Sequence, residues 1–289
     1  MITRICRHIV VLSLLVCQPL FADTSIWQVS KGDQSILLGG TIHLLKESDY
    51  PLPAEFEKAY NEADSLVLEI DLNPQSEVQL QQEIGRAMML PQGQNLKGQL
   101  SEDTYKALQS YAKTQGMNLD HLAMFKPQMV SLIISVTELQ KLGMTAPGVE
   151  DYFSRKAEED NKNIIGLETV SQQVDFLSSM GEGNEDELIL QTLSDVKELP
   201  EMMGAVSDAW KSGDEQALYN AANKPLKDNF PEVYQSLLVE RNNNWMPKIE
   251  RLLKDSKKEL VLVGAAHLTG EQGLLDQLKE KGYTVSKYR

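Results

Sequence analysis

Short apolar segments near both ends of this 289-residue chain, separated by a long helical stretch, constrain the fold more than any other feature. Five segments have the length and composition of strands, namely residues 35–40, 65–70, 163–166, 259–264 and 282–286. Continuous apolar runs of this kind are typical of strands buried on both faces, as in a parallel sheet. We therefore predict an α/β fold whose central parallel or mixed sheet is completed by both ends of the chain.

Helical patterns fill most of the sequence between these strands. Residues 101–116 begin with a serine and two acidic residues and end in glycine, which are the usual signals of a helix start and stop. Residues 127–142 form an apolar, amphipathic stretch that a glycine also ends. We expect one α/β domain over residues 23–289, with a helical insertion at about residues 75–160.

The first 22 residues have the pattern of a secretory signal peptide. Arg4 and Arg7 make a basic start, residues 9–16 are almost purely apolar, and Ala22 offers a small residue at the cleavage position. The apolar run is too short to cross about 30 Å of hydrocarbon comfortably. We expect cleavage after Ala22, no membrane span in the remaining chain, and a periplasmic or secreted location.

Cysteine usage agrees with export. Both cysteines, Cys6 and Cys17, lie in the presequence, so the mature chain can enter an oxidising compartment without mispairing. A lipoprotein signal with Cys17 as the modified residue is the alternative, and the bulky Val16 before it disfavours that alternative.

The composition is that of a soluble globular protein, with 42% hydrophobic and 24% charged residues. The formal net charge is −14, and it becomes −16 when residues 1–22 are removed, because two arginines and no acidic residue are lost. An acidic surface repels phosphate backbones, which argues against nucleic acid as a partner. Nothing in the sequence specifies an oligomeric state.

Two of the three histidines in the mature chain occupy matching positions. Residues 40–43 (Gly-Thr-Ile-His) and 264–267 (Gly-Ala-Ala-His) each follow an apolar strand. Ligands bind beyond the carboxyl ends of parallel strands, so we expect His43 and His267 to lie at one sheet edge. Two neutral imidazoles suit a transition-metal site or an acid–base pair. The alternative is that each histidine only makes a local hydrogen bond at its strand end.

Two glutamates also lie at strand ends. Glu69 is a charged residue inside an apolar run, and Glu168 follows the strand at residues 163–166. A carboxylate in such a position either faces solvent or has a partner at the sheet edge. With the histidines nearby, both glutamates are candidates for a metal ligand or a general base.

The ordered set of motifs resembles the TraB/GumN family. Residues 40–43 resemble its first Gly-x-x-His motif, residues 166–169 (Gly-Leu-Glu-Thr) its central signature, and residues 264–268 its C-terminal block. Arg241 precedes that block, where the family also carries a basic residue. The resemblance covers nearly all of the mature chain in the right order.

This resemblance implies a fold similar to that of the erythromycin-esterase/ChaN-like superfamily and a relationship to TIKI-type animal metalloproteases, which use manganese or cobalt. It further implies roles for particular residues: metal binding for His43 and His267, metal ligand or general base for Glu69 and Glu168, and oxyanion stabilisation for Arg241. The asparagine run at residues 242–244 beside Arg241 is also compatible with a simple helix cap.

The sequence and the resemblance together predict a metal-dependent hydrolase, first of all a peptidase acting on a peptide or protein. A divalent ion held by His43, His267 and one glutamate would activate water, and the other glutamate would accept the proton. Arg241 would stabilise charge on the tetrahedral intermediate. Manganese, cobalt and zinc all suit these donors. Two alternatives stay open, a metal-independent esterase-like hydrolase and a non-catalytic protein that binds a peptide, haem or metal in the same cleft.

Overall fold

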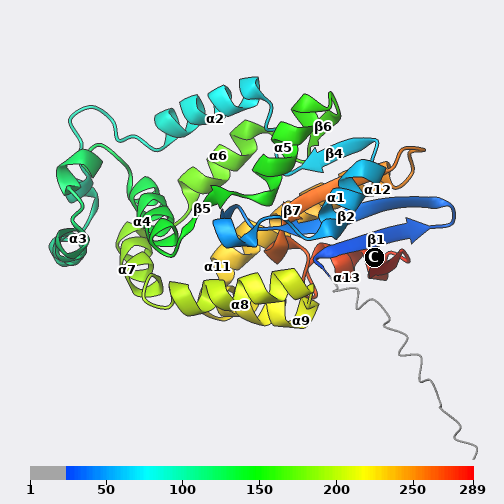
Figure 1. Cartoon of the computed structure of the whole chain (residues 1–289). Coiled ribbons are helices and arrows are strands. Elements are labelled where there is room, and N and C mark those ends of the chain that lie inside the picture. The colour runs from blue at the N-terminus through cyan, green and yellow to red at the C-terminus, as the bar shows by residue number, and fades with distance from the viewer. Residues whose placement is uncertain (1–23) are drawn as a thin grey trace, which may run out of the picture.

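The computed structural model describes residues 24–289, which form a six-stranded sheet flanked by helices (Figure 1). In spatial order the strands are β6 (Asn163–Gly166), β4 (Ser65–Leu68), β7 (Glu259–Gly264), β2 (Gln34–Thr41), β1 (Ile26–Lys31) and β8 (Thr284–Lys287). The first four are parallel to one another, whereas β1 is antiparallel to both β2 and β8. The predicted mixed sheet completed by both ends of the chain is therefore confirmed.

The sequence did not predict β1, nor the small second sheet of β3 (Leu44–Lys46) and β5 (Met144–Pro147). β1 alternates buried and partly exposed residues instead of forming a continuous apolar run. β3 and β5 have only three and four residues, which is too short for a recognisable period.

The helices surround the central sheet, and their ends follow the predicted signals where these were clear. The helices are α1 (Ala54–Glu62), α2 (Pro74–Ala87), α3 (Glu102–Gln115), α4 (Pro127–Lys141), α5 (Val149–Glu159), α6 (Val170–Ser179), α7 (Glu185–Asp195), α8 (Leu199–Ser212), α9 (Glu215–Leu218), α10 (Lys224–Asn229), α11 (Pro231–Tyr234), α12 (Arg241–Leu252) and α13 (Leu274–Glu280). The hydroxyl of Ser101 caps α3, and Gly116 ends it with a φ of 67°.

Each face of the sheet has its own hydrophobic core. On one face, Phe56, Phe153 and Trp210 from α1, α5 and α8 pack against the strands. On the other face, Trp245 and Leu278 from α12 and α13 do so. The sheet is thus the middle of three layers, and its buried strands fix the position of the residues at their ends.

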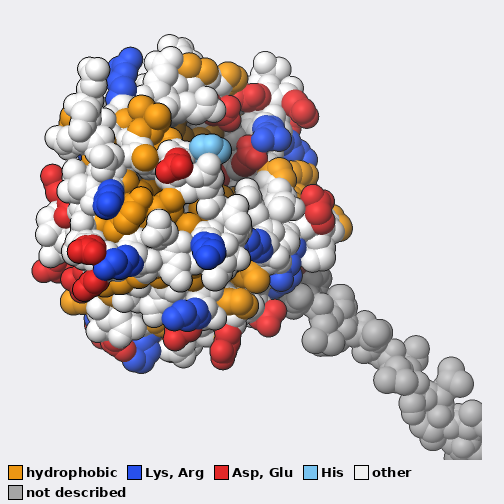
Figure 2. All heavy atoms as spheres, turned by 90° about the vertical axis from the view of Figure 1, so that its left-hand side faces the viewer, with side chains coloured by type: hydrophobic (Ala, Val, Ile, Leu, Met, Phe, Trp, Pro, Cys, Tyr) orange, Lys and Arg blue, Asp and Glu red, His pale blue; other side chains and the backbone are white. Residues whose placement is uncertain are grey.

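Helices α3, α4 and α7 form a lobe beside the carboxyl ends of the parallel strands (Figure 1). The lobe has a separate core that includes Leu108, Ile134 and Ile189. It combines part of the expected insertion with α7, whereas α5, which lies within that range, packs on the sheet. Figure 2 shows this side of the molecule, where hydrophobic side chains reach the surface among scattered charged groups.

The expected signal peptide, its cleavage after Ala22 and the alternative lipid attachment at Cys17 lie outside the described residues. Within residues 24–289, none of the helices combines the length and the apolar character needed to cross a membrane.

Glu259 at the start of β7 is a buried acid whose ionisation should oppose folding. Its side chain is 1% exposed, and its Oε2 has no hydrogen-bond partner among the described residues. Burial, together with the nearby Asp255 and Asp64, raises the pKa of Glu259 to about 7. The pKa of Glu259 is therefore higher in the folded than in the unfolded chain. As a result, the free energy of unfolding decreases as the pH rises from about 4.5, the ordinary pKa of a glutamate, to about 7.

We predict that Glu259→Gln raises the free energy of unfolding by about 1–3 kcal/mol at pH 8 and by much less at pH 4.5. Thermal unfolding of both proteins at the two pH values checks this. Glu158→Gln, an exposed position on α5, is the matched control and should change little at either pH. An equal shift at pH 8 and pH 4.5 for Glu259→Gln would contradict the ionisation argument.

Candidate active site

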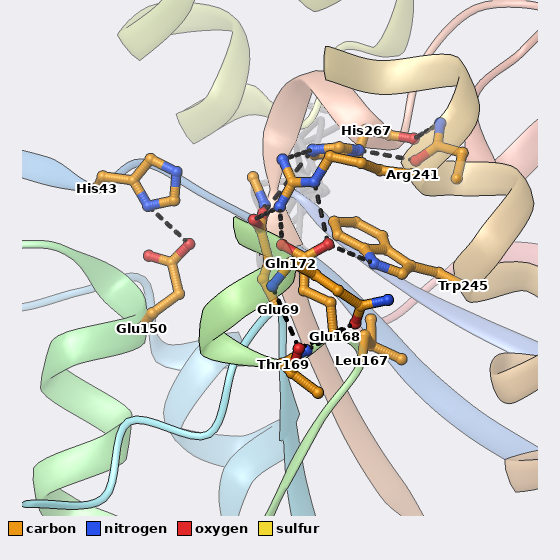
Figure 3. Close-up of polar contacts among 12 residues, drawn as sticks. His43, Glu69, Glu150, Leu167, Glu168, Thr169, Gln172, Arg241, Trp245 and His267 are labelled. Atoms are coloured by element: carbon orange, nitrogen blue, oxygen red, sulfur yellow. Dashed lines mark hydrogen bonds and ion pairs between the residues drawn. The ribbon is translucent and has the colours of Figure 1, made fainter. Parts of the chain in front are cut away.

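The residues predicted for the site gather at the carboxyl edge of the sheet (Figure 3). His43 lies just beyond β2, Glu69 follows β4 directly, and Glu168 lies just beyond β6. His267 ends a short 3-10 turn after β7. Four neighbouring parallel strands therefore deliver one side chain each to the same edge, as expected from their direction.

The glycines of the two Gly-x-x-His motifs have different surroundings. A Cβ at Gly40 would lie 2.9 Å from Leu268 Cδ1 and 3.2 Å from Ala265, so this glycine allows β2 to pack against the turn that carries His267. A Cβ at Gly264 would instead lie 3.2 Å from Glu69 Oε1 and 3.7 Å from His43 Nε2. Gly264 therefore leaves open space inside the site.

Glu150 in the first turn of α5 joins His43, although the sequence gave no sign of it. The pairing of β3, which follows His43, with β5, which precedes α5, brings the two segments together. Gly148 lies directly against the backbone of His43, where a side chain would not fit. As a result Glu150 Oε1 lies 3.1 Å from His43 Nδ1 and also accepts a hydrogen bond from the Thr41 hydroxyl.

His43, Glu69 and Glu150 form the one group within residues 24–289 whose donor atoms are arranged to hold a metal ion. One ligand atom from each lies within 4.8 Å of the others. Glu150 is 6% exposed, yet its Oε2 has no hydrogen-bond partner among the described residues. A buried carboxylate oxygen without a partner is costly, and a cation beside it would remove that cost. Together with the space beside Gly264, this free oxygen means that the residues fit a divalent ion.

The charges in this group are strongly coupled. The Glu150 carboxylate raises the pKa of His43 to about 9. Burial alone would raise the pKa of Glu69, but His267, Arg241 and His43 outweigh it and lower the pKa to about 2. Glu69 is therefore ionised at neutral pH. The side chain of His43 is 70% exposed, so the group is open to a ligand from solvent.

Arg241, at the start of α12, connects the remaining predicted residues. Its Nη2 lies 2.5 Å from Glu69 Oε2 and 2.6 Å from Glu168 Oε1, and its Nε donates to Glu168 Oε2 at 3.2 Å. Its Nη1 lies 3.2 Å from His267 Nε2. The guanidinium carbon lies 4.7 Å from the centre of the Trp245 ring, and Trp245 Nε1 donates to Glu168 Oε2. Glu168 is thus held by Arg241 and Trp245.

The protonation state of His267 follows from its neighbour Asn242. Asn242 Nδ2 donates to the backbone carbonyls of His267 and Gln272, so its Oδ1 is the atom that faces His267 Nδ1, at 2.7 Å. His267 Nδ1 must therefore carry the proton, and Nε2 offers a lone pair to Arg241. Burial lowers the pKa of His267 to about 3, so the ring is neutral at physiological pH.

Two π-helical turns position the residues that hold His267. The turn Gln235–Glu240 leads directly into Arg241, and the turn Tyr219–Asn223 ends in an asparagine whose Nδ2 donates to Ala266 O at 2.8 Å. A π-helical turn adds a residue to the helix and so changes the direction of the side chains that follow. Such turns are frequent at functional sites.

The structure therefore brings all five predicted residues into one network but divides them into two groups. His43 and Glu69 share the candidate metal group with Glu150, whereas His267 and Glu168 face Arg241. The third histidine within residues 24–289, His121, is exposed and contacts the Asn118 side chain at 3.4 Å, away from the site. Nothing in one sequence distinguishes Glu150 from other acidic residues at helix starts.

Comparison with known proteins extends these observations. The model of the TraB/PrgY/gumN family matches residues 25–287. The chain is 25% identical to the uncharacterized protein YbaP of Escherichia coli (strain K12), over 86% of this chain and 89% of that protein. It is 23% identical to metalloprotease TIKI2 of Xenopus tropicalis, over 91% of this chain but only 59% of that protein. The similarity to metalloprotease TIKI1 of the same species has the same identity and covers 61% of that protein. No solved structure matches the chain.

Proposed function

Because the chain belongs to the TraB/PrgY/gumN family, we propose from its site that it is a metal-dependent hydrolase, and specifically a peptidase. The observation that carries this proposal is the convergence of His43, Glu69 and Glu150, with one donor atom of each within 4.8 Å of the others. The similarity to proteins named metalloproteases supports it and suggests a peptide or protein substrate. On the pattern of residues 1–22, we propose that the protein acts in the periplasm or outside the cell.

In this proposal, metal binding displaces the proton from His43 Nε2, and this nitrogen binds the divalent ion while Glu150 Oε1 accepts the hydrogen of Nδ1. A carboxylate that orients a ligating imidazole in this way is usual at metal sites. Glu69 contributes a second ligand, and the Gly264 N–H, which donates to Glu69 Oε1 at 2.8 Å, fixes its direction. Manganese, cobalt or zinc bound there would supply a Lewis acid that lowers the pKa of water and polarises a substrate carbonyl.

The other residues prepare the site for this chemistry. Glu150 Oε2 is buried and makes no hydrogen bond within the described chain, and we assign to it the role of coordinating the ion or receiving a proton. Glu168 holds Arg241 against Glu69, so in our proposal it acts through Arg241. Arg241 Nη1, which among the described residues contacts only His267, is the donor that we assign to a developing oxyanion.

We predict that purified residues 23–289 hydrolyse a fluorogenic peptide library when supplied with manganese, cobalt or zinc. A chelator should abolish this activity and added metal should restore it. His43→Ala should reduce the rate by at least about 100-fold, because it removes the imidazole ligand. His121→Ala, the histidine outside the site, is the matched control and should keep full activity.

Each other outcome identifies a different class of protein. Hydrolysis that resists chelators but needs His43 would contradict the metal role and favour an esterase-like mechanism. Stoichiometric metal binding with no turnover of any peptide would contradict the enzyme assignment and favour a binding protein that uses the same residues.

A further inference from the structure

We infer that Arg241 occupies the position of a second cation, so that the site accepts one divalent ion per chain. This inference rests on the proposed metal site at His43, Glu69 and Glu150, and it specifies how many ions that site takes. It also gives His267 and Glu168 a role, because both point at the guanidinium (Figure 3).

The atoms around the guanidinium are of the kinds that bind a metal ion. They are His267 Nε2, Glu69 Oε2 and both carboxylate oxygens of Glu168, at 2.5–3.2 Å from the guanidinium nitrogens. His267 Nε2 offers a lone pair, because Asn242 keeps the proton on Nδ1. An imidazole lone pair and two carboxylates are the donor set of many transition-metal sites. In this protein, the cation that these donor atoms surround is the guanidinium of Arg241 and not a metal ion.

Glu69 connects the two positions. Its Oε1 lies on the side of Gly264 and His43, and its Oε2 accepts a hydrogen bond from Arg241. In two-metal hydrolases, a pair of ions about 3.5–4 Å apart acts on the same substrate. Here Glu69 Oε2, on the side away from His43, already binds the positively charged guanidinium of Arg241. Only the position beside Glu69 Oε1 and His43 is then left for a metal ion.

The guanidinium is held too firmly to make way for an ion. Its side chain is 11% exposed, and the rings of Trp245 and Phe176 lie 4.7 and 5.7 Å from its central carbon. Trp245 also donates to Glu168, so the ring and the carboxylate that bind Arg241 fix each other. A second ion would have to displace a cation that is already desolvated and hydrogen bonded on several sides.

The experiment is to count manganese ions in the wild type and in two Arg241 variants. Calorimetric titration and the metal content after gel filtration give the number of ions, and electron paramagnetic resonance distinguishes an isolated Mn²⁺ from a coupled pair. We expect one isolated ion in the wild type. Arg241→Ala should bind two ions and show the coupled signal. Arg241→Lys, which keeps a positive charge at this position, should again bind one.

Two ions in the wild type would overturn the inference, and so would a folded Arg241→Ala variant that binds only one ion beside His43. If the wild type binds none and Arg241→Ala binds one, Arg241 does occupy a cation position, but the proposed metal site at His43 fails and the count of one ion per wild-type chain fails with it. If neither protein binds manganese, both fail. Should Arg241→Ala fold only with metal present, it is refolded with manganese and counted in the same way, and the wild-type count decides independently.

Discussion

The Gly264→Ala variant is expected to fold, with a smaller loss of stability than Gly40→Ala, and to bind divalent metal roughly 10- to 100-fold more weakly than the wild type. The backbone at Gly264 has a φ of −48°, which alanine adopts without strain. The added Cβ would lie 3.2 Å from Glu69 Oε1 and 3.7 Å from His43 Nε2, in the space between two proposed ligands. The substitution therefore fills the site without removing any ligand or charge.

Gly40→Ala is the matched control, because it makes the same change in the other Gly-x-x-His motif. Its Cβ would lie 2.9 Å from Leu268 Cδ1 and 3.2 Å from Ala265, within packed structure and not in the site. Overpacking of this kind costs about 1–3 kcal/mol, so this variant should melt at a lower temperature. Thermal unfolding and calorimetric metal titration of both variants test the contrast. Wild-type affinity in Gly264→Ala would mean that no ion uses this space.

The fold was predictable from the sequence where a strand is buried on both faces. The runs at residues 35–40 and 259–264 correspond to β2 and β7 in the middle of the sheet, and both are continuous and apolar. β1 was not predicted, because three of its six residues are polar and its place in the sheet depends on antiparallel pairing between β2 and β8. β4 ends at Leu68, two residues before the predicted end, and the chain bends at Glu69, whose side chain contacts Arg241.

Part of the candidate site was predictable for the same reason. His43, His267, Glu69 and Glu168 follow parallel strands, and such strands end at one sheet edge. Glu150 was not predictable, because its position depends on the pairing of β3 with β5, two strands that are separated by about a hundred residues.

The division of the site between a metal group and Arg241 was also beyond the sequence. Arg241 follows the π-helical turn Gln235–Glu240, which sets the direction of its side chain. The hydrogen bond from Asn242 decides which nitrogen of His267 carries the proton. The spacing of residues in one sequence reveals neither the π-helical turn that directs Arg241 nor the tautomer of His267.

We expect Glu150→Gln to weaken metal binding by at least about 100-fold, because it neutralises a ligand and replaces one carboxylate oxygen by an amide nitrogen. Glu168→Gln should bind one ion with an affinity within about tenfold of the wild type, the lower end of what loss of an indirect partner costs. Glu168 contacts Arg241 and Trp245 instead of the proposed ion. Calorimetric titration with manganese at fixed pH compares the two variants.

In thermal unfolding, the ranking of these two variants should be reversed: Glu168→Gln, which loses less metal affinity, should lose more stability than Glu150→Gln. Glu168→Gln removes a charged partner from the buried guanidinium of Arg241 and should lower the free energy of unfolding by about 1.5–3 kcal/mol. Glu150→Gln removes a buried charge whose Oε2 has no partner in the described chain, so its cost should be smaller. If Glu168→Gln instead loses metal as completely as Glu150→Gln, then Glu168 is itself a ligand, as the sequence alone suggested. Arg241 would then have to leave Glu168 when the ion binds, and the inference of a fixed internal cation would fail with it.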